Sequence, residues 1–320
     1  MNNRKFRIGL FLTISLIWSV IWFSQKHLLS DFISRNLPVS ILIGLIPTFG
    51  LLLGVLITRN KLPKRQMSLM GANFYMTLLF VSVPIICLTL FGVDNSFNIQ
   101  PNLFGLMISI FTMVYALFEE IGWRGYLQEE FMEKSQKWFG YVFVGFIWYL
   151  WHWYFLREGN NPKLIMLPIL IASSIGIGEI ARITKTILIC AAVHSLVNMM
   201  IIYSLIANNI TENARLTTLI ACLIIWIPLI IIKNRNNNKI LPPTTAKKHT
   251  AKNIQITLVH SIPTTGFLFP LIQLRSLLFL SRFPPTFGTQ FLFAWNFQVN
   301  FLRFLAWVIP SPKFQVHSSL

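Results

Sequence analysis

The sequence predicts an all-α, polytopic helical membrane protein with about eight transmembrane helices. Hydrophobic residues make up 54% of the 320 residues and charged residues only 12%. The mean hydropathy is +0.62, and several apolar runs approach or exceed the roughly 18 residues that can cross a bilayer as a helix. Short segments rich in Lys and Arg separate these runs. This composition excludes an ordinary soluble domain.

The apolar runs place the elements in order. We expect spans at residues 8–24, 38–58, 72–92, 104–131, 139–157, 163–180, 186–206 and 216–232. The first resembles a signal peptide, but no small-residue cleavage site follows Ser24, so it is kept as a span. The fourth is too long for one perpendicular crossing, which predicts a tilt or a projection beyond the membrane. The sixth is short and contains Pro168, which predicts a broken or partly inserted segment.

The basic residues indicate the orientation of these spans. Most Lys and Arg lie in alternate connections, beginning with Arg4, Lys5 and Arg7 before the first span. By the positive-inside rule the N-terminus is cytoplasmic. The net charge of +17 would suit a nucleic-acid partner, but its position between apolar runs favours lipid headgroups and topology instead. We therefore expect the lipid bilayer as a partner and no nucleic acid.

The chain divides into a membrane domain, residues 1–232, and a basic linker with a poorly ordered, aromatic-rich tail, residues 233–320. No Asp or Glu follows Glu212. Residues 291–309 are nearly apolar and suit either an interfacial segment or a ninth span; an unrelated appendage is a further alternative. The cysteines Cys87, Cys190 and Cys222 lie within apolar runs and are interpreted as small core residues.

Two adjacent carboxylates and an arginine interrupt the fourth span. Glu120 and Arg124 are four residues apart with the acid first, the favourable order for a helical pair. Glu119 is turned about 100° away on the same helix, so it is left for other chemistry. A charge at membrane depth costs about 2.5 to 3.5 kcal/mol on insertion scales, and such residues usually face a bundle interior or a water-filled cavity. An ion pair that serves only packing is the alternative.

Later spans add two histidines and an amide. His152 follows Trp148 by four residues in the fifth span, and His194 precedes Asn198 by four in the seventh. A single buried histidine is more often a packing residue than a ligand. Asn198 alone would be interpreted as a residue that hydrogen-bonds between helices. Together they lie at similar predicted depths of about 10 to 18 Å from the inner ends of their helices. The joint pattern predicts one shared polar cavity.

An acid, two imidazoles and a carboxamide in a dry cavity suit the activation of water. Glu119 could act directly as the general base. Alternatively, Glu119, His152 and His194 could hold a metal that lowers the pKa of a bound water, and two His with one Glu is a zinc ligand set. His194 and Asn198 would then donate hydrogen bonds to an oxyanion. Zinc is compatible with these residues but is not required by them, because the His-Glu-x-x-His helix is missing.

These motifs resemble those of the CPBP family, the CAAX-protease and bacteriocin-processing intramembrane proteases also known as Abi proteins. The family pattern is Glu-Glu-x-x-x-Arg, Phe-x-x-x-His and His-x-x-x-Asn on separate helices. The first and third are complete here, and Trp148 replaces the usual Phe in the second. The resemblance covers about residues 70–205. It implies a membrane peptidase in which Glu119 activates water, His152, His194 and Asn198 assist, and Glu120 and Arg124 orient the helix.

The predicted function is therefore an intramembrane endopeptidase that cleaves a membrane-associated protein or peptide, with zinc as an optional cofactor. The resemblance further implies a bacterial plasma-membrane protein linked to bacteriocin processing or immunity. Two alternatives stay open. One is a non-catalytic immunity protein that binds a partner with the same fold. The other is a proton-coupled transporter, which the lack of two similar halves disfavours.

Overall fold

The computed structural model describes residues 4–25, 37–58, 67–132, 137–152, 162–202 and 208–240. Within these ranges it contains helices and no strand, so the predicted all-α class is confirmed. The helices are α1 (Arg4–Gln25), α3 (Leu37–Thr58), α4 (Phe74–Phe91), α5 (Pro101–Gly122), η3 (Trp123–Gln128), α6 (Glu129–Met132), α7 (Lys137–Trp151), α9 (Pro162–Thr184), α10 (Ile187–Val197), η4 (Asn198–Ile202) and α12 (Glu212–Ile240).

Six of the described helical segments are long and apolar enough to cross a membrane. One of them is the continuous stretch of α5, η3 and α6, which spans 31 residues from Pro101 to Phe131. This agrees with the prediction that the fourth span exceeds one perpendicular crossing. The segments Trp138–Trp151 and Ile187–Met200 are shorter apolar helices.

Two expectations about the spans were wrong. The sixth span is not broken, because α9 continues from Pro162 to Thr184 with Pro168 inside it. A proline is tolerated there since neighbouring helices and local adjustment compensate the lost hydrogen bond. The last helix does not end at residue 232, because α12 runs on to Ile240. Asn237 anchors this extension, its side-chain amide donating to the carbonyl of Ile183 on α9 at 2.9 Å.

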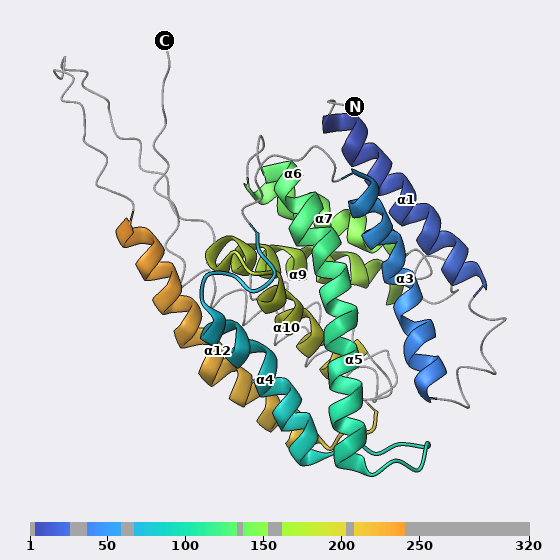
Figure 1. Ribbon diagram of the computed structural model, residues 1–320, viewed down its shortest axis with the longest axis vertical. Coiled ribbons are helices and arrows are strands. Elements are labelled where there is room, and N and C mark those ends of the chain that lie inside the picture. Colours follow the sequence, from blue (N-terminus) through green and yellow to red (C-terminus); the bar gives the residue numbers. More distant parts are fainter. Residues whose placement is uncertain are drawn as a thin grey trace, which may run out of the picture.

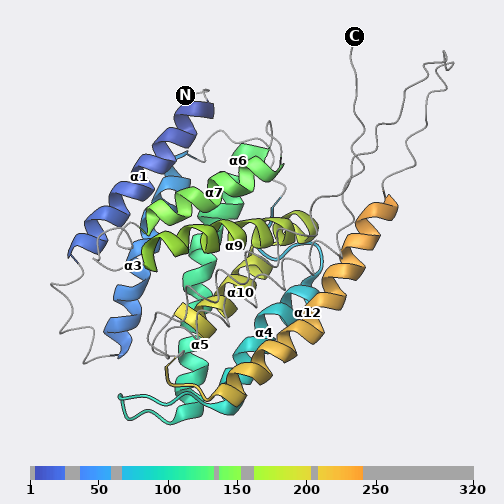
Figure 2. The same ribbon diagram turned by 180° about the vertical axis from the view of Figure 1, so that it is seen from behind.

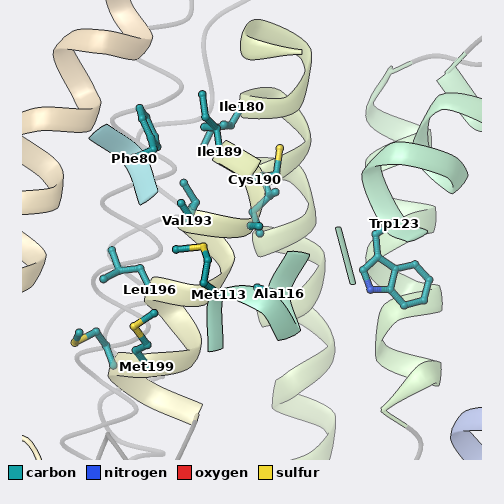
Figure 3. Close-up of a cluster of buried hydrophobic side chains, with 14 of the residues drawn as sticks. Phe80, Met113, Ala116, Trp123, Ile180, Ile189, Cys190, Val193, Leu196 and Met199 are labelled. Atoms are coloured by element: carbon teal, nitrogen blue, oxygen red, sulfur yellow. The ribbon is translucent and has the colours of Figure 1, made fainter. Parts of the chain in front are cut away.

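The short helix α10 lies at the centre of the bundle. It packs against α4, α5 and α9, while α12 covers α4 and α9 from outside and α1 packs on α3 (Figures 1 and 2). Figure 3 shows Cys190, Val193 and Leu196 of α10 among side chains of these neighbours. Nearly every residue of α10 is buried. A histidine on this helix is therefore withdrawn from lipid.

Glycines let the helices around the site approach closely. A Cβ on Gly105 of α5 would lie 2.2 Å from the carbonyl oxygen of Leu88 on α4. A Cβ on Gly145 of α7 would lie 2.7 Å from the Cα of Ile171 on α9. Small residues at such contacts increase van der Waals packing, which drives helix association where lipid supplies no hydrophobic force.

A short extended segment before α4 fixes the start of α10. The amide of Ile187 donates to the carbonyl of Ser68 at 3.0 Å, and the amide of Leu188 donates to Leu69 at 3.1 Å. These bonds satisfy amides that a helix N-terminus leaves without an intrahelical acceptor. Residues 67–71 are called the clasp below. The clasp also contacts the end of the continuous stretch of α5, η3 and α6, called the motif helix below. The amide of Met67 donates to Glu129 Oε1 on α6 at 2.7 Å.

The predicted tail does not enter this description. Residues 241–320, including the apolar stretch 291–309, lie outside the described residues. So do the predicted ends of the fifth and seventh spans at 153–157 and 203–206. The boundary between the membrane domain and the tail stays a prediction. The cysteines Cys87, Cys190 and Cys222 are free thiols within the described helices, as expected from their apolar surroundings.

Candidate active site

The acid pair lies where an α-helix changes to a π-helix. Glu119 and Glu120 occupy the last turn of α5, and the π-helical turn η3 begins at Trp123. The amide of Trp123 is shared between the carbonyls of Glu119 and Glu120. Single π-helical turns inside α-helices occur frequently at functional sites. The widened turn alters which side chains share a face after Glu120, and hydropathy gave no sign of it.

Glu120 is held by two partners. Its Oε1 accepts from Nη1 of Arg124 at 2.8 Å and from Nδ1 of His194 at 2.8 Å. Both side chains of the ion pair are fully buried, so the predicted pairing of Glu120 with Arg124 is confirmed. Arg124 Nε and Nη2 and Glu120 Oε2 are buried without a hydrogen-bond partner among the described residues. A buried pair with unsatisfied atoms is a poor source of stability, which favours a functional role.

Glu119 has a different environment. Its Oε2 accepts from the indole Nε1 of Trp148 at 2.8 Å and from that of Trp123 at 3.1 Å. The side chain is 1% exposed. No described residue donates to its Oε1. The two adjacent acids therefore point to separate partners, as their 100° offset predicted, although the partners of Glu119 are tryptophans.

Trp148 contacts most of the other motif residues. Besides its bond to Glu119, its ring lies under the guanidinium of Arg124, with 5.0 Å from the Arg124 Cζ to the ring centroid. The ring meets His194 edge-on at 4.9 Å between centroids and lies 6.2 Å from the ring of His152. The predicted orienting role of Trp148 is thereby extended, because this side chain joins the motifs of α5, α7 and α10.

His152 lies just after the end of α7 and is partly exposed. Its Nδ1 lies 3.0 Å from the carbonyl oxygen of Trp148. A carbonyl can only accept, so Nδ1 carries the proton and Nε2 of the neutral ring is the basic nitrogen. The indole of Trp148 bonds to Glu119, meets His194 edge-on and lies 6.2 Å from the ring of His152. The acid and the two imidazoles therefore surround one indole, and their joint role as a site stays a prediction.

Asn198 lies one turn beyond His194 and opens the second π-helical turn, η4. It is buried, at 8% exposure. Its backbone amide is shared between the carbonyls of His194 and Ser195. Its side-chain amide makes no hydrogen bond to any residue that the structure describes. A buried amide with spare donors is suited to bind a group that enters the site.

The described residues do not fit the predicted zinc ligand set in this arrangement. No group of three His, Cys, Asp or Glu side chains among them could hold a metal ion. The reason is visible in the contacts: Glu119 Oε2 faces two N–H donors, and His194 Nδ1 faces Glu120. Zinc ligation by Glu119, His152 and His194 stays a prediction, and no step below depends on it.

Residues outside the predicted set support the site. Trp123 was not predicted from the motifs, although its place four residues after Glu119 could have indicated a shared helix face. The carboxylate of Glu179 pairs with Arg182 within α9 and accepts from the hydroxyl of Tyr141 on α7 at 3.5 Å. On α6, Glu130 pairs with Arg7 at 3.4 Å and with Arg4 at 3.3 Å. The Tyr141 bond links α7 to α9, and the Glu130 ion pairs link α1 to α6.

Comparison with known proteins agrees with this geometry. A protein-family model described as "Type II CAAX prenyl endopeptidase Rce1-like" matches residues 101–200. The matched segment begins with α5 and contains the acid pair, both histidines and Asn198. Comparison with the curated proteins finds no match. The segment 101–200 is therefore similar to the Rce1-like type II CAAX prenyl endopeptidases.

Proposed function

We propose that this protein is an intramembrane endopeptidase in which Glu119 activates the attacking water. The observation that supports this most is the division of labour within the acid pair. Glu120 accepts from both Arg124 and His194, whereas Glu119 accepts from described residues through Oε2 only. Oε1 of Glu119 is thus available to accept a proton, while Glu120 holds Arg124 and His194 in position. General-base catalysis needs such a positioned carboxylate.

The proposed reaction begins with transfer of a water proton to Glu119 Oε1. The hydroxide oxygen attacks the scissile carbonyl carbon, and the carbonyl π electrons move to oxygen. The side-chain amide of Asn198 would donate to this oxyanion, and so would Nε2 of His194 when the ring carries a second proton besides the one on Nδ1. When the tetrahedral intermediate collapses, the C–N bond breaks and the leaving nitrogen takes the proton back from Glu119. The products are an amine and a carboxylic acid, which then gives its proton to the amine or to solvent.

His152 is proposed to assist at the same stage. Because its Nδ1 proton is engaged by the Trp148 carbonyl, its Nε2 is the nitrogen that can bind the water or relay a proton. Proton transfer by a positioned imidazole typically contributes about 10²- to 10⁴-fold to a rate. Its partial exposure supports a role between the buried acid and water.

The substrate class proposed is a membrane-anchored peptide. The matching family is named for CAAX prenyl endopeptidases, so the first probe is a farnesylated peptide with a Cys-aliphatic-aliphatic-x C-terminus and a quenched fluorophore. The lipid anchor would keep such a peptide in the bilayer that surrounds the helices. The cytoplasmic N-terminus and a bacterial plasma-membrane location belong to the same proposal and follow from the basic loops and the motif resemblance.

The test uses full-length protein in liposomes. Glu119→Gln keeps a carbonyl oxygen that can accept from both indoles but cannot take a proton from water, so the fold should persist while cleavage disappears. Glu212→Gln is the matched control, because Glu212 on α12 is 81% exposed and lies outside the motifs. Equal turnover by wild-type and Glu119→Gln protein would refute the proposed base.

The non-catalytic alternative makes the opposite prediction. An immunity protein that only binds a bacteriocin or another partner would retain its phenotype in Glu119→Gln and His194→Gln variants. Loss of protection in parallel with loss of cleavage would assign the phenotype to hydrolysis.

A further inference from the structure

Two indoles, those of Trp123 and Trp148, donate hydrogen bonds to the same oxygen of Glu119, Oε2. Trp123 belongs to the same helical stretch as Glu119, and Trp148 comes from α7. Their Nε1 atoms lie 3.1 Å and 2.8 Å from Oε2. An indole N–H is a donor only, so neither tryptophan can exchange roles with the acid or accept its proton. Both bonds therefore act in one direction, on one atom.

Packing alone does not explain this arrangement. Trp151 and Trp226 are also buried, at 0% and 5% exposure. Their indole nitrogens have no hydrogen-bond partner among the described residues. This fold thus buries tryptophans without satisfying every indole N–H. The indoles of Trp123 and Trp148 donate to the same carboxylate oxygen, whereas the partly buried indole of Trp18 donates to a backbone carbonyl, that of Ile46, at 2.8 Å.

We propose that Trp123 and Trp148 are positioning residues that dedicate Glu119 Oε1 to the attacking water; this rests on the proposed role of Glu119 as the base. With Oε2 bonded to two donors, the carboxylate cannot rotate to exchange its oxygens without breaking both bonds. Oε1 is then the oxygen presented to water. Preorganised geometry of this kind raises the rate because little has to rearrange when the proton moves.

The pair of indoles of Trp123 and Trp148, called the clamp below, also couples Glu119 to α7, the helix that ends just before His152. Trp148 reaches Glu119 from α7, and the carbonyl of the same residue accepts from Nδ1 of His152. One residue thereby sets the orientation of the carboxylate and the tautomer of the imidazole. The clamp is distinct from the Glu120 network, because Arg124 and His194 bond to the other acid.

The kinetic test compares three Trp→Phe variants of the full chain in liposomes. Trp148→Phe and Trp123→Phe each remove one N–H while retaining an aromatic ring, and Trp226→Phe removes an indole that bonds to no described residue. Loss of one hydrogen bond to a charged group should lower kcat about tenfold or more with KM nearly unchanged. Trp226→Phe should retain wild-type kcat. Unchanged kcat in both Trp148→Phe and Trp123→Phe would overturn the positioning role.

A spectroscopic test reads the clamp without activity. The chain has ten tryptophans, and ¹⁵N-labelled protein gives one indole N–H signal for each; the Trp→Phe variants assign the relevant three. Glu119→Leu removes the acceptor, so the Trp123 and Trp148 signals should move upfield while the Trp226 signal stays. Unmoved Trp123 and Trp148 signals would refute the clamp even if a Trp→Phe variant failed to fold.

The two measurements separate the failure of each idea. If Glu119→Gln remains active while the indole signals respond to Glu119→Leu, the proposed base is wrong and the catalytic consequence of the clamp fails with it. If Glu119→Gln is inactive but Trp148→Phe and Trp123→Phe keep wild-type kcat, the base stands and the positioning role is refuted. An inactive Glu119→Gln, together with a lower kcat in Trp148→Phe and Trp123→Phe but not in Trp226→Phe, supports both.

Discussion

His194 donates its Nδ1 proton to Glu120, with 2.8 Å between the nitrogen and Oε1, although Glu119 is the neighbouring acid in the sequence. An ionised carboxylate only accepts, so the bond fixes which nitrogen of His194 carries a proton. The same oxygen accepts from Arg124. Glu120 therefore links α10 to the motif helix and presents Nε2 of His194 to the site.

Removal of Glu120 should destabilise the protein strongly. In Glu120→Ala, Arg124 would remain fully buried without its counter-charge, and breaking such a pair costs about 3 to 5 kcal/mol. Thermal unfolding in detergent measures this against Asp94→Ala, which removes an exposed acid outside the motifs. The double variant Glu120→Leu/Arg124→Leu should recover part of the loss, because no lone charge is left buried. A double variant no more stable than Glu120→Ala would argue against the uncompensated-charge explanation.

Asn198 should matter for turnover more than for stability. Its side-chain amide has no partner among the described residues, so Asn198→Ala breaks no such hydrogen bond of the resting protein. Loss of an oxyanion donor typically lowers kcat about 10²- to 10³-fold. Asn237→Ala is a suitable control, because that amide does bond within the fold, to Ile183. We expect Asn237→Ala to lower the unfolding temperature and Asn198→Ala to lower kcat; the reverse pattern would contradict the assignment.

The clasp should tolerate no side chain at Gly71. Its φ is +69°, and an added Cβ would lie 1.9 Å from Oγ1 of Thr186 at the start of α10. We expect Gly71→Ala to destabilise by at least about 1 kcal/mol from backbone strain, with more from the clash. Gly9→Ala on α1 is the control, since its Cβ would meet nothing within 4 Å. Comparable unfolding temperatures for the two variants would show that the clasp does not restrain α10.

Truncation after Ile240 should leave cleavage intact. Every residue assigned to the site lies between 119 and 198, and the last described helix ends at Ile240. A chain of residues 1–240 should match the kcat and KM of the full chain on the farnesylated probe. A fall in kcat would assign residues 241–320 a part in the reaction and would correct the predicted division at the tail.

The sequence was sufficient to predict the membrane helices and which of them carry the candidate site residues. Apolar runs report membrane helices because a backbone in lipid must satisfy its own hydrogen bonds. Charged residues inside those runs are costly enough to indicate function. The same reasoning failed for α9, where Pro168 suggested a break that neighbouring helices compensate, and for the polar end of α12, where a contact with α9 extends the helix.

By itself, the sequence determined the membrane bundle, the pairing of Glu120 with Arg124, and the separation of Glu119 from that pair. These features depend on spacings of a few residues along one helix, which the sequence alone specifies. Only the tertiary structure decided that His194 serves Glu120 and that Trp148 and Trp123 bind Glu119. Contacts between distant helices depend on rotations and on π-helical turns that hydropathy does not encode. The sequence motifs therefore predict which residues lie near one another, whereas the packing of the helices determines which of their atoms form hydrogen bonds.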